Sequence, residues 1–426
     1  CITGCWSVYV NGVEYETTNA NISEEGSPIT EDALAMGMAV TVQGSVNSDG
    51  MTGTANSISY DDNVEGIVLA NTIAADGKID VMGQMVNVGP DMAFESHVPG
   101  ITMPEEIVPG NVVEVSGYTD GNGMIFGTRI EVKSAAYTPG DEIEVKGKVS
   151  GSTATSFMIG TLNIDYSTAT LDGLTAPIAD GTYVEAKSIE AINTLTMTMV
   201  AFKVEAEDDD MDESEGSESE IEGIVTAVLS ESLFMLNDKT VRHDSSTEFE
   251  DGTATDIIVG AKMEAEGTYN IDNELVAEEI EFRQGTEIEV EAFIDSIGAD
   301  TVTVFGETFT VNNFTAKDDD SDSDEFYFDL GDLAAGDRIE LHGYFDDATS
   351  SLIATSLVRH NDDSSELEIQ GPVDEDVMAD ATSLSMFGVT VDISAINLAG
   401  NIAAGDSVEF KGSFDGTQFI ATSMKN

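Results

Sequence analysis

Aspartates are the residues of this chain whose type and spacing best suit metal binding. They are densest in residues 318–329, DDDSDSDEFYFD. The aspartates alternate along this stretch as the ligands of a calcium-binding loop do, and the last falls at the twelfth position. Ser323 stands where an EF-hand requires glycine, so the pattern predicts a looser calcium site with oxygen ligands. A solvated acidic insertion is the alternative. The predicted ligands are Asp318, Asp320, Asp322, Asp324 and Asp329.

Residues that could act as catalysts form no recognisable arrangement in the sequence. The histidines lie in different segments, and none has a neighbour at the spacing of metal ligands. The sequence contains no G-x-S-x-G, no H-E-x-x-H and no glycine loop for phosphate. We therefore predict no catalytic residue and no organic cofactor, which leaves calcium as the expected cofactor, and we rank an enzyme last among the functional classes. The four histidines are His97, His243, His342 and His360.

The charge of the chain restricts its partners. The 426 residues include 82 Asp and Glu against 16 Lys and Arg, a net charge of −66. Such a surface repels phosphate backbones and anionic lipid, so nucleic acid is excluded as a natural partner. Self-repulsion weakens a compact state unless cations screen it, which predicts a saline or calcium-containing medium. Hydrophobic residues make up 41% of the chain, enough for packed cores.

The two cysteines, Cys1 and Cys5, stand at the start of the sequence. A leading cysteine resembles the lipidated residue of a mature bacterial lipoprotein, and the scarcity of other cysteines fits an exported protein without a disulfide framework. We therefore expect an extracellular or bacterial cell-surface location, with membrane contact only through a lipid anchor at Cys1. A disulfide between Cys1 and Cys5, within or between chains, is the alternative.

One eight-residue segment, typified by GDRIELHG at 336–343, occurs six times, with first glycines 69 to 79 residues apart. Apolar residues at the third and fifth positions after the first glycine flank a glutamate, as in Ile339-Glu340-Leu341, except in the first copy, which has Thr41. This alternation predicts a strand with one dry and one wet face, and the spacing predicts one domain repeated six times. The other copies are GMAVTVQG (37–44), GNVVEVSG (110–117), GTYVEAKS (181–188), GAKMEAEG (260–267) and GDSVEFKG (405–412).

Each copy is expected to contain three strands, a variable loop that holds a short helix, and two more strands. Five short strands in about 70 residues suit a small OB-like barrel better than a sandwich. The predicted fold class is all-β, with six tandem five-stranded OB-like β-barrel modules in an elongated chain. The predicted boundaries are residues 1–62 for module 1, 63–134 for module 2, 141–205 for module 3, 206–220 for an acidic linker, 221–284 for module 4, 286–362 for module 5 with its acidic insertion, and 366–426 for module 6.

The elements EGIV, NGVEYET and GMAVTVQG…TANSIS resemble those of a bacterial family of domains of unknown function. OB-like modules of that family occur in tandem in exported lipoproteins, and the resemblance spans nearly the whole chain. It is specific for the module and carries no catalytic residues, so what it implies concerns the fold and an exported location.

Module 1 has no room for a full-length opening strand, because counting back from its first hairpin turn, Asn11-Gly12, places that strand at or before Cys1. The strand WSVYV (6–10) would then expose an edge that can recruit a strand from another molecule. A shortened strand or an open barrel is the alternative.

The hypothesis that accounts for most of these features is a non-catalytic extracellular structural protein. It would form a cell-surface stalk or a head-to-tail filament stabilised by calcium. Its expected partner is a second copy of the chain or another cell-surface component. The runner-up is a surface lipoprotein that binds calcium, a small ligand or a glycan in specialised copies.

Overall fold

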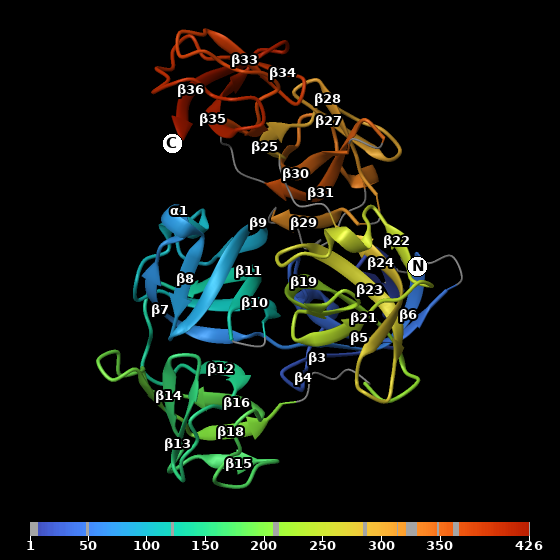
Figure 1. Cartoon of the computed structure of the whole chain (residues 1–426). Helices are drawn as coiled ribbons and strands as arrows, with labels where there is room; N and C mark the ends of the chain where they lie inside the picture. The colour runs from blue at the N-terminus through green and yellow to red at the C-terminus, as the bar shows by residue number, and fades with distance from the viewer. Residues whose placement is uncertain are drawn as a thin grey trace, which may run out of the picture. The chain divides into compact units, whose positions relative to one another are not determined.

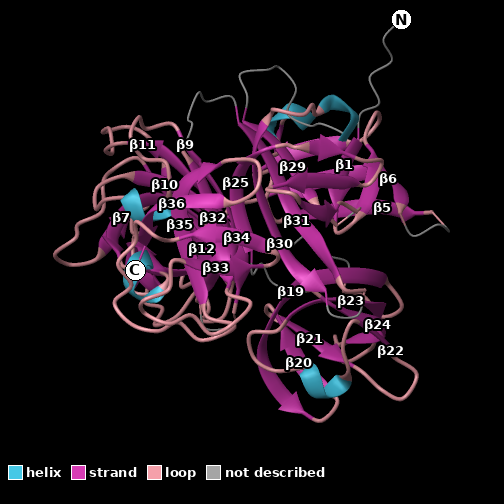
Figure 2. Cartoon of the chain, turned by 90° about the horizontal axis from the view of Figure 1, so that it is seen from above, coloured by secondary structure: helices cyan, strands magenta, loops and turns pink. Residues whose placement is uncertain are grey.

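The computed structural model describes residues 7–47, 51–120, 123–207, 213–283, 288–312, 314–320, 330–346, 349–360 and 366–425. Strands dominate these residues, and the helices are single turns (Figures 1 and 2). The predicted all-β fold class of repeated sheets is therefore confirmed. No helix in the described part of the chain is long and apolar enough to cross a membrane.

The chain forms two compact units. Unit 1 comprises Cys1–Thr18, Ser45–Thr54 and Gln284–Asn426, and unit 2 comprises Asn19–Gly44 and Ala55–Arg283. Module 1 thus contributes to both units, modules 2 to 4 belong to unit 2, and modules 5 and 6 belong to unit 1.

Module 2 shows the barrel most completely. Its strands are β7 (Val64–Asn71), β8 (Lys78–Val81), β9 (Gln84–Ser96), β10 (Val112–Thr119) and β11 (Ile125–Ser134). The pairings run β7–β8–β9–β11–β10 and return from β10 to β7, so the sheet closes. Only β9 and β11 pair in parallel, which is the strand order of an OB barrel.

The remaining modules of unit 2 repeat this order. Module 3 contains β12 (Ile143–Lys148), β13 (Ser156–Ile159), β14 (Leu162–Asp165), β15 (Thr170–Asp172), β16 (Tyr183–Ser188), β17 (Thr198–Val200) and β18 (Lys203–Ala206). Module 4 contains β19 (Glu218–Ser230), β20 (Leu233–Leu236), β21 (Lys239–Arg242), β22 (Glu248–Glu250), β23 (Lys262–Tyr269) and β24 (Leu275–Phe282). The last three residues of the predicted acidic linker thus lie in β19, and residues 208–212 of the linker lie outside the described residues.

Unit 1 contains the last two modules. Module 5 consists of β25 (Ile288–Phe293), β26 (Ser296–Ile297), β27 (Thr301–Val304), β28 (Glu307–Thr310), β29 (Ala316–Asp320), β30 (Arg338–Asp346) and β31 (Ser351–His360). Module 6 consists of β32 (Leu367–Pro372), β33 (Ser383–Met386), β34 (Val389–Asp392), β35 (Ser407–Phe414) and β36 (Phe419–Lys425).

Module 1 contains β1 (Ser7–Val10), β2 (Val13–Glu16), β3 (Asn21–Glu24), β4 (Ser27–Pro28), β5 (Val40–Val46) and β6 (Thr52–Tyr60). No opening strand occurs among residues 7–47 and 51–60. The segment expected to supply a shortened one, with Cys1 and Cys5, lies outside the described residues.

The variable loop after the third strand also follows a common plan. In modules 1 to 5 this region includes a segment that pairs in parallel with the closing strand, as β22 does with β24. A single-turn 3-10 helix follows in four modules, which confirms the predicted short helix there. These helices span Glu31–Ala33, Pro104–Glu106, Ala254–Asp256 and Leu330–Asp332.

The two glycines of the repeated segment have different structural causes. The first adopts a positive φ in every copy, from 82° at Gly37 to 103° at Gly110, a conformation that a side chain disfavours. The second lies at a bulge against the closing strand, as at Gly267 and Gly412. A Cβ on Gly412 would overlap the carbonyl of Ile420.

Opening strands of neighbouring modules pair directly with each other. In unit 2, β7 of module 2 pairs antiparallel with β12 of module 3, and in unit 1, β25 of module 5 pairs antiparallel with β32 of module 6. Modules 2 and 3 consequently share one hydrophobic core, as do modules 5 and 6, whereas module 4 has its own. Two of the three cores are therefore shared by a pair of modules, and the third belongs to module 4 alone.

Candidate cation-binding site

The central glutamate of the repeated strand marks the site. We predicted that this residue faces solvent, and this is wrong for Glu114, Glu185 and Glu409, which are buried beside the apolar residues of the same strands. The cause is that other side chains cover this face of the strand. In module 2, the phenol of Tyr60 donates a hydrogen bond to Oε1 of Glu114 at 2.7 Å. The repeated spacing therefore places these carboxylates in buried positions.

Five glutamates stand directly opposite one another across five neighbouring strands of unit 2. The cross-strand pairs are Glu95–Glu131, Glu131–Glu114, Glu114–Glu65 and Glu65–Glu144. Like charges at directly opposed positions destabilise a sheet, so this glutamate row requires counter-charge.

Basic side chains supply part of that charge. Lys133 Nζ lies 2.7 Å from Glu114, and the guanidinium of Arg129 pairs with Glu95. At the module 3 end of the row, Glu144 faces Lys187, whose ammonium donates to it at 2.7 Å. Glu65, the fourth glutamate of the row, forms no ion pair among the described residues. The counter-charge is thus placed on both sides of Glu65 and not on Glu65 itself.

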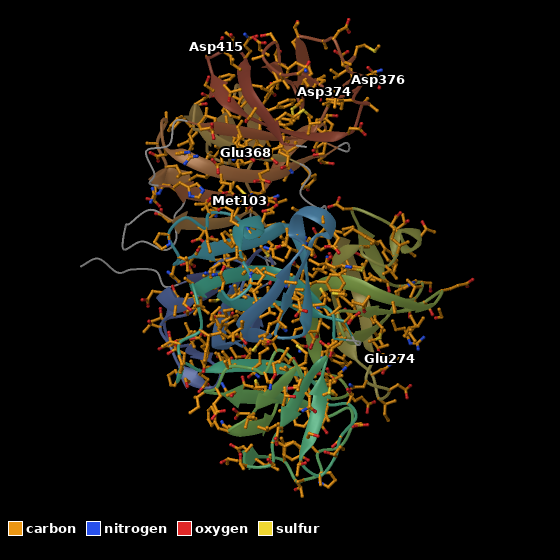
Figure 3. The ribbon with its side chains drawn as sticks, turned by 90° about the vertical axis from the view of Figure 1, so that its left-hand side faces the viewer. Met103, Glu274, Glu368, Asp374, Asp376 and Asp415 are labelled. Atoms are coloured by element: carbon orange, nitrogen blue, oxygen red, sulfur yellow. The ribbon has the colours of Figure 1, made fainter. Side chains whose placement is uncertain are left out.

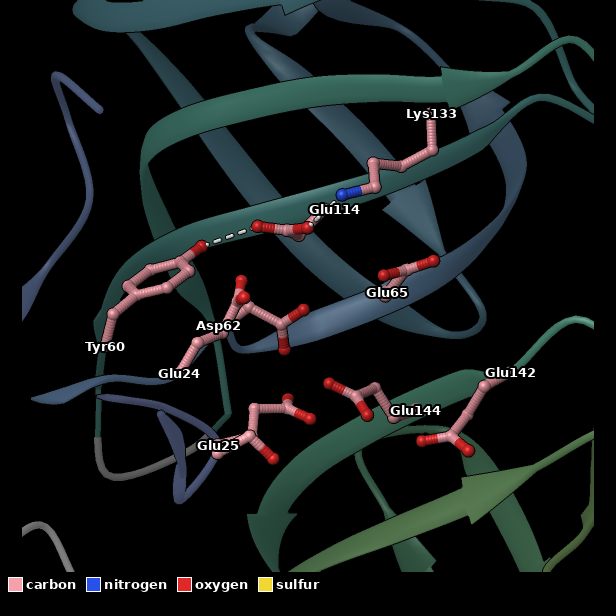
Figure 4. A pocket seen from close by; sticks show the side chains of 10 residues that line it. Glu24, Glu25, Tyr60, Asp62, Glu65, Glu114, Lys133, Glu142 and Glu144 are labelled. Atoms are coloured by element: carbon pink, nitrogen blue, oxygen red, sulfur yellow. Dashed lines mark hydrogen bonds and ion pairs between the residues drawn. The ribbon is translucent and has the colours of Figure 1, made fainter. Parts of the chain in front are cut away.

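A cavity of about 310 Å³ opens beside Glu114, Glu65 and Glu144 of the row (Figure 4). Seven carboxyl groups and a single ammonium group line it. They come from the β3–β4 hairpin of module 1, the segment before β7, the barrel of module 2 and the opening strand of module 3. The lining residues are Glu24, Glu25, Ser27, Tyr60, Asp62, Glu65, Glu114, Lys133, Glu142 and Glu144.

Asp62 is the most unusual residue of the cavity. It is only 5% exposed, and its Oδ1 accepts no hydrogen bond from the described residues. Aligned on the opening strands, the same position of the repeat holds Ile143, Ile288 or Leu367, each a core residue of its module. Module 2 therefore carries a carboxylate where modules 3, 5 and 6 carry an aliphatic side chain and module 4 carries Ser219.

Asp62 belongs to two groups of three carboxylates whose oxygens lie within 4.8 Å of one another. The first group adds Glu65 and Glu114, and the second adds Glu25 and Glu144. Carboxylate oxygens at such separations are the donor set of a hard divalent cation. The cavity is therefore chemically suited to bind a divalent cation.

Burial and neighbouring charge set the ionisation of the cavity. Burial raises the pKa of Asp62 well above its ordinary value and the pKa of Glu65 to about 7, and Glu114 adds to both shifts. Burial also tends to raise the pKa of Glu25. The hydrogen bond between Glu25 and Glu144 and the ammonium groups of Lys146 and Lys187 outweigh this effect and lower the pKa of Glu25 to about 2. Proton uptake and cation binding thus compete most strongly in the half of the cavity that contains Asp62 and Glu65.

Two other copies also bring their central glutamate into a group of three. In module 3, Glu185 lies with Glu205 and Glu207, and in module 5, Glu340 lies with Glu289 and His342. His342 and His360 approach Glu340 at 2.7 and 3.2 Å, so the fold brings together histidines that are 18 positions apart in the sequence.

The predicted calcium loop is only partly described. Asp318 and Asp320 lie in β29, which pairs in parallel with β31. Between them, Asp319 is buried and pairs with the guanidinium of Arg359. Asp322, Asp324 and Asp329 lie outside the described residues, so this calcium site stays a prediction.

Acidic side chains also occupy the outer surface. Figure 3 shows Asp374, Asp376 and Asp415 at the periphery of module 6 and Glu274 at the periphery of module 4. Asp62 differs from these residues because it is buried. The sequence feature that could have identified it is a charged residue at a position where modules 3, 5 and 6 have an aliphatic one.

Comparison with known proteins places four of the six modules in one family. The model of a domain of unknown function, DUF5666, matches residues 3–59, 65–131, 222–281 and 285–357, which together exceed half of the chain. A solved structure titled "drosophila Unr CSD456" is 12% identical over 51% of this chain and 96% of its own, with a TM-score of 0.12. No curated protein matches the sequence. The chain belongs to the DUF5666 family, with four matched copies in tandem.

Proposed function

We propose that this protein is a non-catalytic extracellular structural protein whose modules form a cell-surface stalk or a head-to-tail filament stabilised by calcium. The observation that carries the proposal is the direct pairing of opening strands between neighbouring modules, β7 with β12 and β25 with β32. A backbone ladder that continues across a module boundary, with a shared core beneath it, resists bending between the two modules. A load-bearing array requires that property.

The charge supports the calcium part of the proposal. A net charge of −66 opposes close packing of modules unless cations screen it, and the glutamate row concentrates this repulsion where modules 2 and 3 join. Millimolar calcium, which is typical outside cells, would relieve that repulsion.

The N-terminal edge supports self-association. Strand β1 stands at the end of its sheet order, with β2 as its neighbour. A strand from a second copy that adds to this edge would form a heterologous contact, and repetition of such a contact yields an open filament.

Electron microscopy tests the proposal. The full chain and a variant without residues 1–10 are imaged at high protein concentration, in calcium and in chelator at equal ionic strength. We expect filaments of the full chain in calcium and none of the truncated variant. Monomers under every condition would contradict the filament, and non-reducing electrophoresis of the same samples reports whether Cys1 or Cys5 joins the copies.

Ligand binding by a specialised copy is the second candidate function. One observation favours it: module 2 has Asp62 where modules 3, 5 and 6 have Ile143, Ile288 and Leu367. Saturable binding of a defined ligand, without assembly, would support this candidate over the structural one.

A further inference from the structure

We propose that Asp62, Glu65 and Glu114 bind one calcium ion in the cavity of unit 2, and that Glu24 of module 1 completes the carboxylate set. The inference deepens the calcium stabilisation of the proposed function and rests on it in that respect. It assigns the ion to residues other than those of the acidic insertion in module 5.

Charge selects this group over the other one that contains Asp62. Both oxygens of Glu25 already meet ammonium groups, Lys146 at 3.5 Å and Lys187 at 2.5 Å, and Lys187 also binds Glu144. In the half of the cavity with Asp62, Glu65 and Glu114, the one ammonium group among the lining residues is Lys133, which is shared with Glu131 at 3.3 Å. Lys146 also acts on Asp62 through its charge, but its ion pairs are with Glu25, Asp61 and Glu185. The excess of negative charge lies in this half, so a cation is more favourable there.

Asp62 provides the independent observation. A buried carboxylate oxygen without a hydrogen-bond partner costs more free energy than the aliphatic residue that modules 3, 5 and 6 have at the same position. Oδ1 has no hydrogen-bond partner among the described residues that would offset this cost, and Asp62 is one of the residues that line the cavity. A bound cation explains both the burial and the missing hydrogen bond.

The geometry favours calcium over magnesium. Calcium accepts six to eight oxygens at about 2.3–2.6 Å, so oxygens up to nearly 5 Å apart can share it. Magnesium requires a smaller octahedral shell and keeps several of its waters. The three carboxylates have oxygens within 4.8 Å of one another, and the cavity of about 310 Å³ has room for additional water ligands.

The ion would join two modules. Glu24 ends strand β3 of module 1, whereas Asp62 and Glu65 precede and begin the barrel of module 2. Glu24 lines the same cavity and forms no ion pair among the described residues. Calcium would therefore connect the variable segment of module 1 to module 2.

Calorimetric titration of the full chain with calcium, and separately with magnesium, tests the site at fixed pH and ionic strength. We expect one high-affinity class of calcium sites, and we expect Asp62→Asn to weaken its affinity at least about tenfold. The unmodified chain should bind magnesium more weakly than calcium. Glu291→Gln is the matched control, because Glu291 faces Glu340 in module 5 as Glu65 faces Glu114 in module 2. The control should retain the high-affinity class.

A second readout reports binding next to Tyr60. Terbium replaces calcium and emits when a nearby tyrosine is excited, and Tyr60 donates a hydrogen bond to Glu114. We expect sensitised emission that calcium displaces, that Tyr60→Phe reduces while calcium still binds, and that Asp62→Asn abolishes. Asp62→Leu, which restores the aliphatic residue of other modules, should raise the melting temperature in chelator and remove the calcium-dependent increase.

Unchanged calcium affinity and terbium emission in Asp62→Asn would overturn the site, as would Asp62→Leu with an undiminished calcium response. The outcomes are separable from those of the proposed function. Calcium binding that depends on Asp62 without any filament supports the site and contradicts the assembly. Filaments that form in calcium while Asp62→Asn changes nothing support the assembly and contradict the site.

Discussion

At the scale of single residues, buried charge decides which positions are sensitive to substitution. Asp62 and Asp319 are both buried aspartates of the chain, yet their surroundings differ. Asp62 has an oxygen without a hydrogen bond, whereas Asp319 lies against the guanidinium of Arg359. The first position points to a ligand, and the second is a structural ion pair.

We predict that Arg359→Leu destabilises module 5 by about 3–5 kcal/mol, because it leaves the carboxylate of Asp319 buried without its partner. The double variant Asp319→Asn with Arg359→Leu removes the charge as well and should be the more stable of the two. Chemical denaturation measures both. Equal stability of the single and double variants would show that the pair carries no such penalty.

How far the candidate site could be predicted also depends on single residues. The repeat alignment identified Glu114 and its counterparts but placed them in solvent, because alternation shows which residues share a face and not what covers that face. Asp62 was accessible to the same alignment as a charge at an aliphatic position. The alternating aspartates of residues 318–329 are the stronger local signal, and they lie in a different module.

At the scale of elements, the repeated strand is specified by its glycines. We predict that Gly412→Ala lowers the stability of module 6 by about 1–3 kcal/mol, because the added Cβ overlaps the carbonyl of Ile420 at the bulge. Gly400→Ala is the control in the same module, since nothing lies within 4 Å of its Cβ position and its φ is not positive. Thermal unfolding should be unchanged or slightly higher for the control. Similar losses at both positions would mean that loss of flexibility, and not overlap at the bulge, determines the effect.

The order of strands within a module was predictable because turns and alternation are local signals. The pairing of β7 with β12 and of β25 with β32 was not, because it depends on which strand edges meet in space. The parallel segments, such as β22 beside β24, were also missed, since their sequences were assigned to a variable loop.

At the scale of the molecule, shared cores define the units that unfold together. Ile339 lies in the core common to modules 5 and 6, and module 4 has a separate core. We predict that Ile339→Asp unfolds modules 5 and 6 together and leaves module 4 intact, because one unpaired charge in a core costs several kcal/mol. Limited proteolysis with mapping of the cleavage sites distinguishes this from loss of module 5 alone, which would contradict the shared core.

Carboxyl groups that the fold withdraws from solvent make the stability of the chain depend on pH. Burial, reinforced by a neighbouring carboxylate, raises the pKa of Glu264 to about 8; burial also raises the pKa of Glu185 to about 8, against the ammonium of Lys146. Such a group stabilises the fold fully below its unfolded pKa of about 4.5, and the stabilisation disappears as the pH rises through its folded pKa. Glu25, with a pKa lowered to about 2, acts in the opposite sense and loses its contribution only in stronger acid. In chelator, we therefore expect the melting temperature to fall by at least about 5 °C between pH 5 and pH 8. Calcium should reduce this fall, because it replaces the bound protons as counter-charge for the carboxylates. A melting temperature that stays constant or rises over this range in chelator would show that these carboxylates are already ionised and compensated in the folded chain.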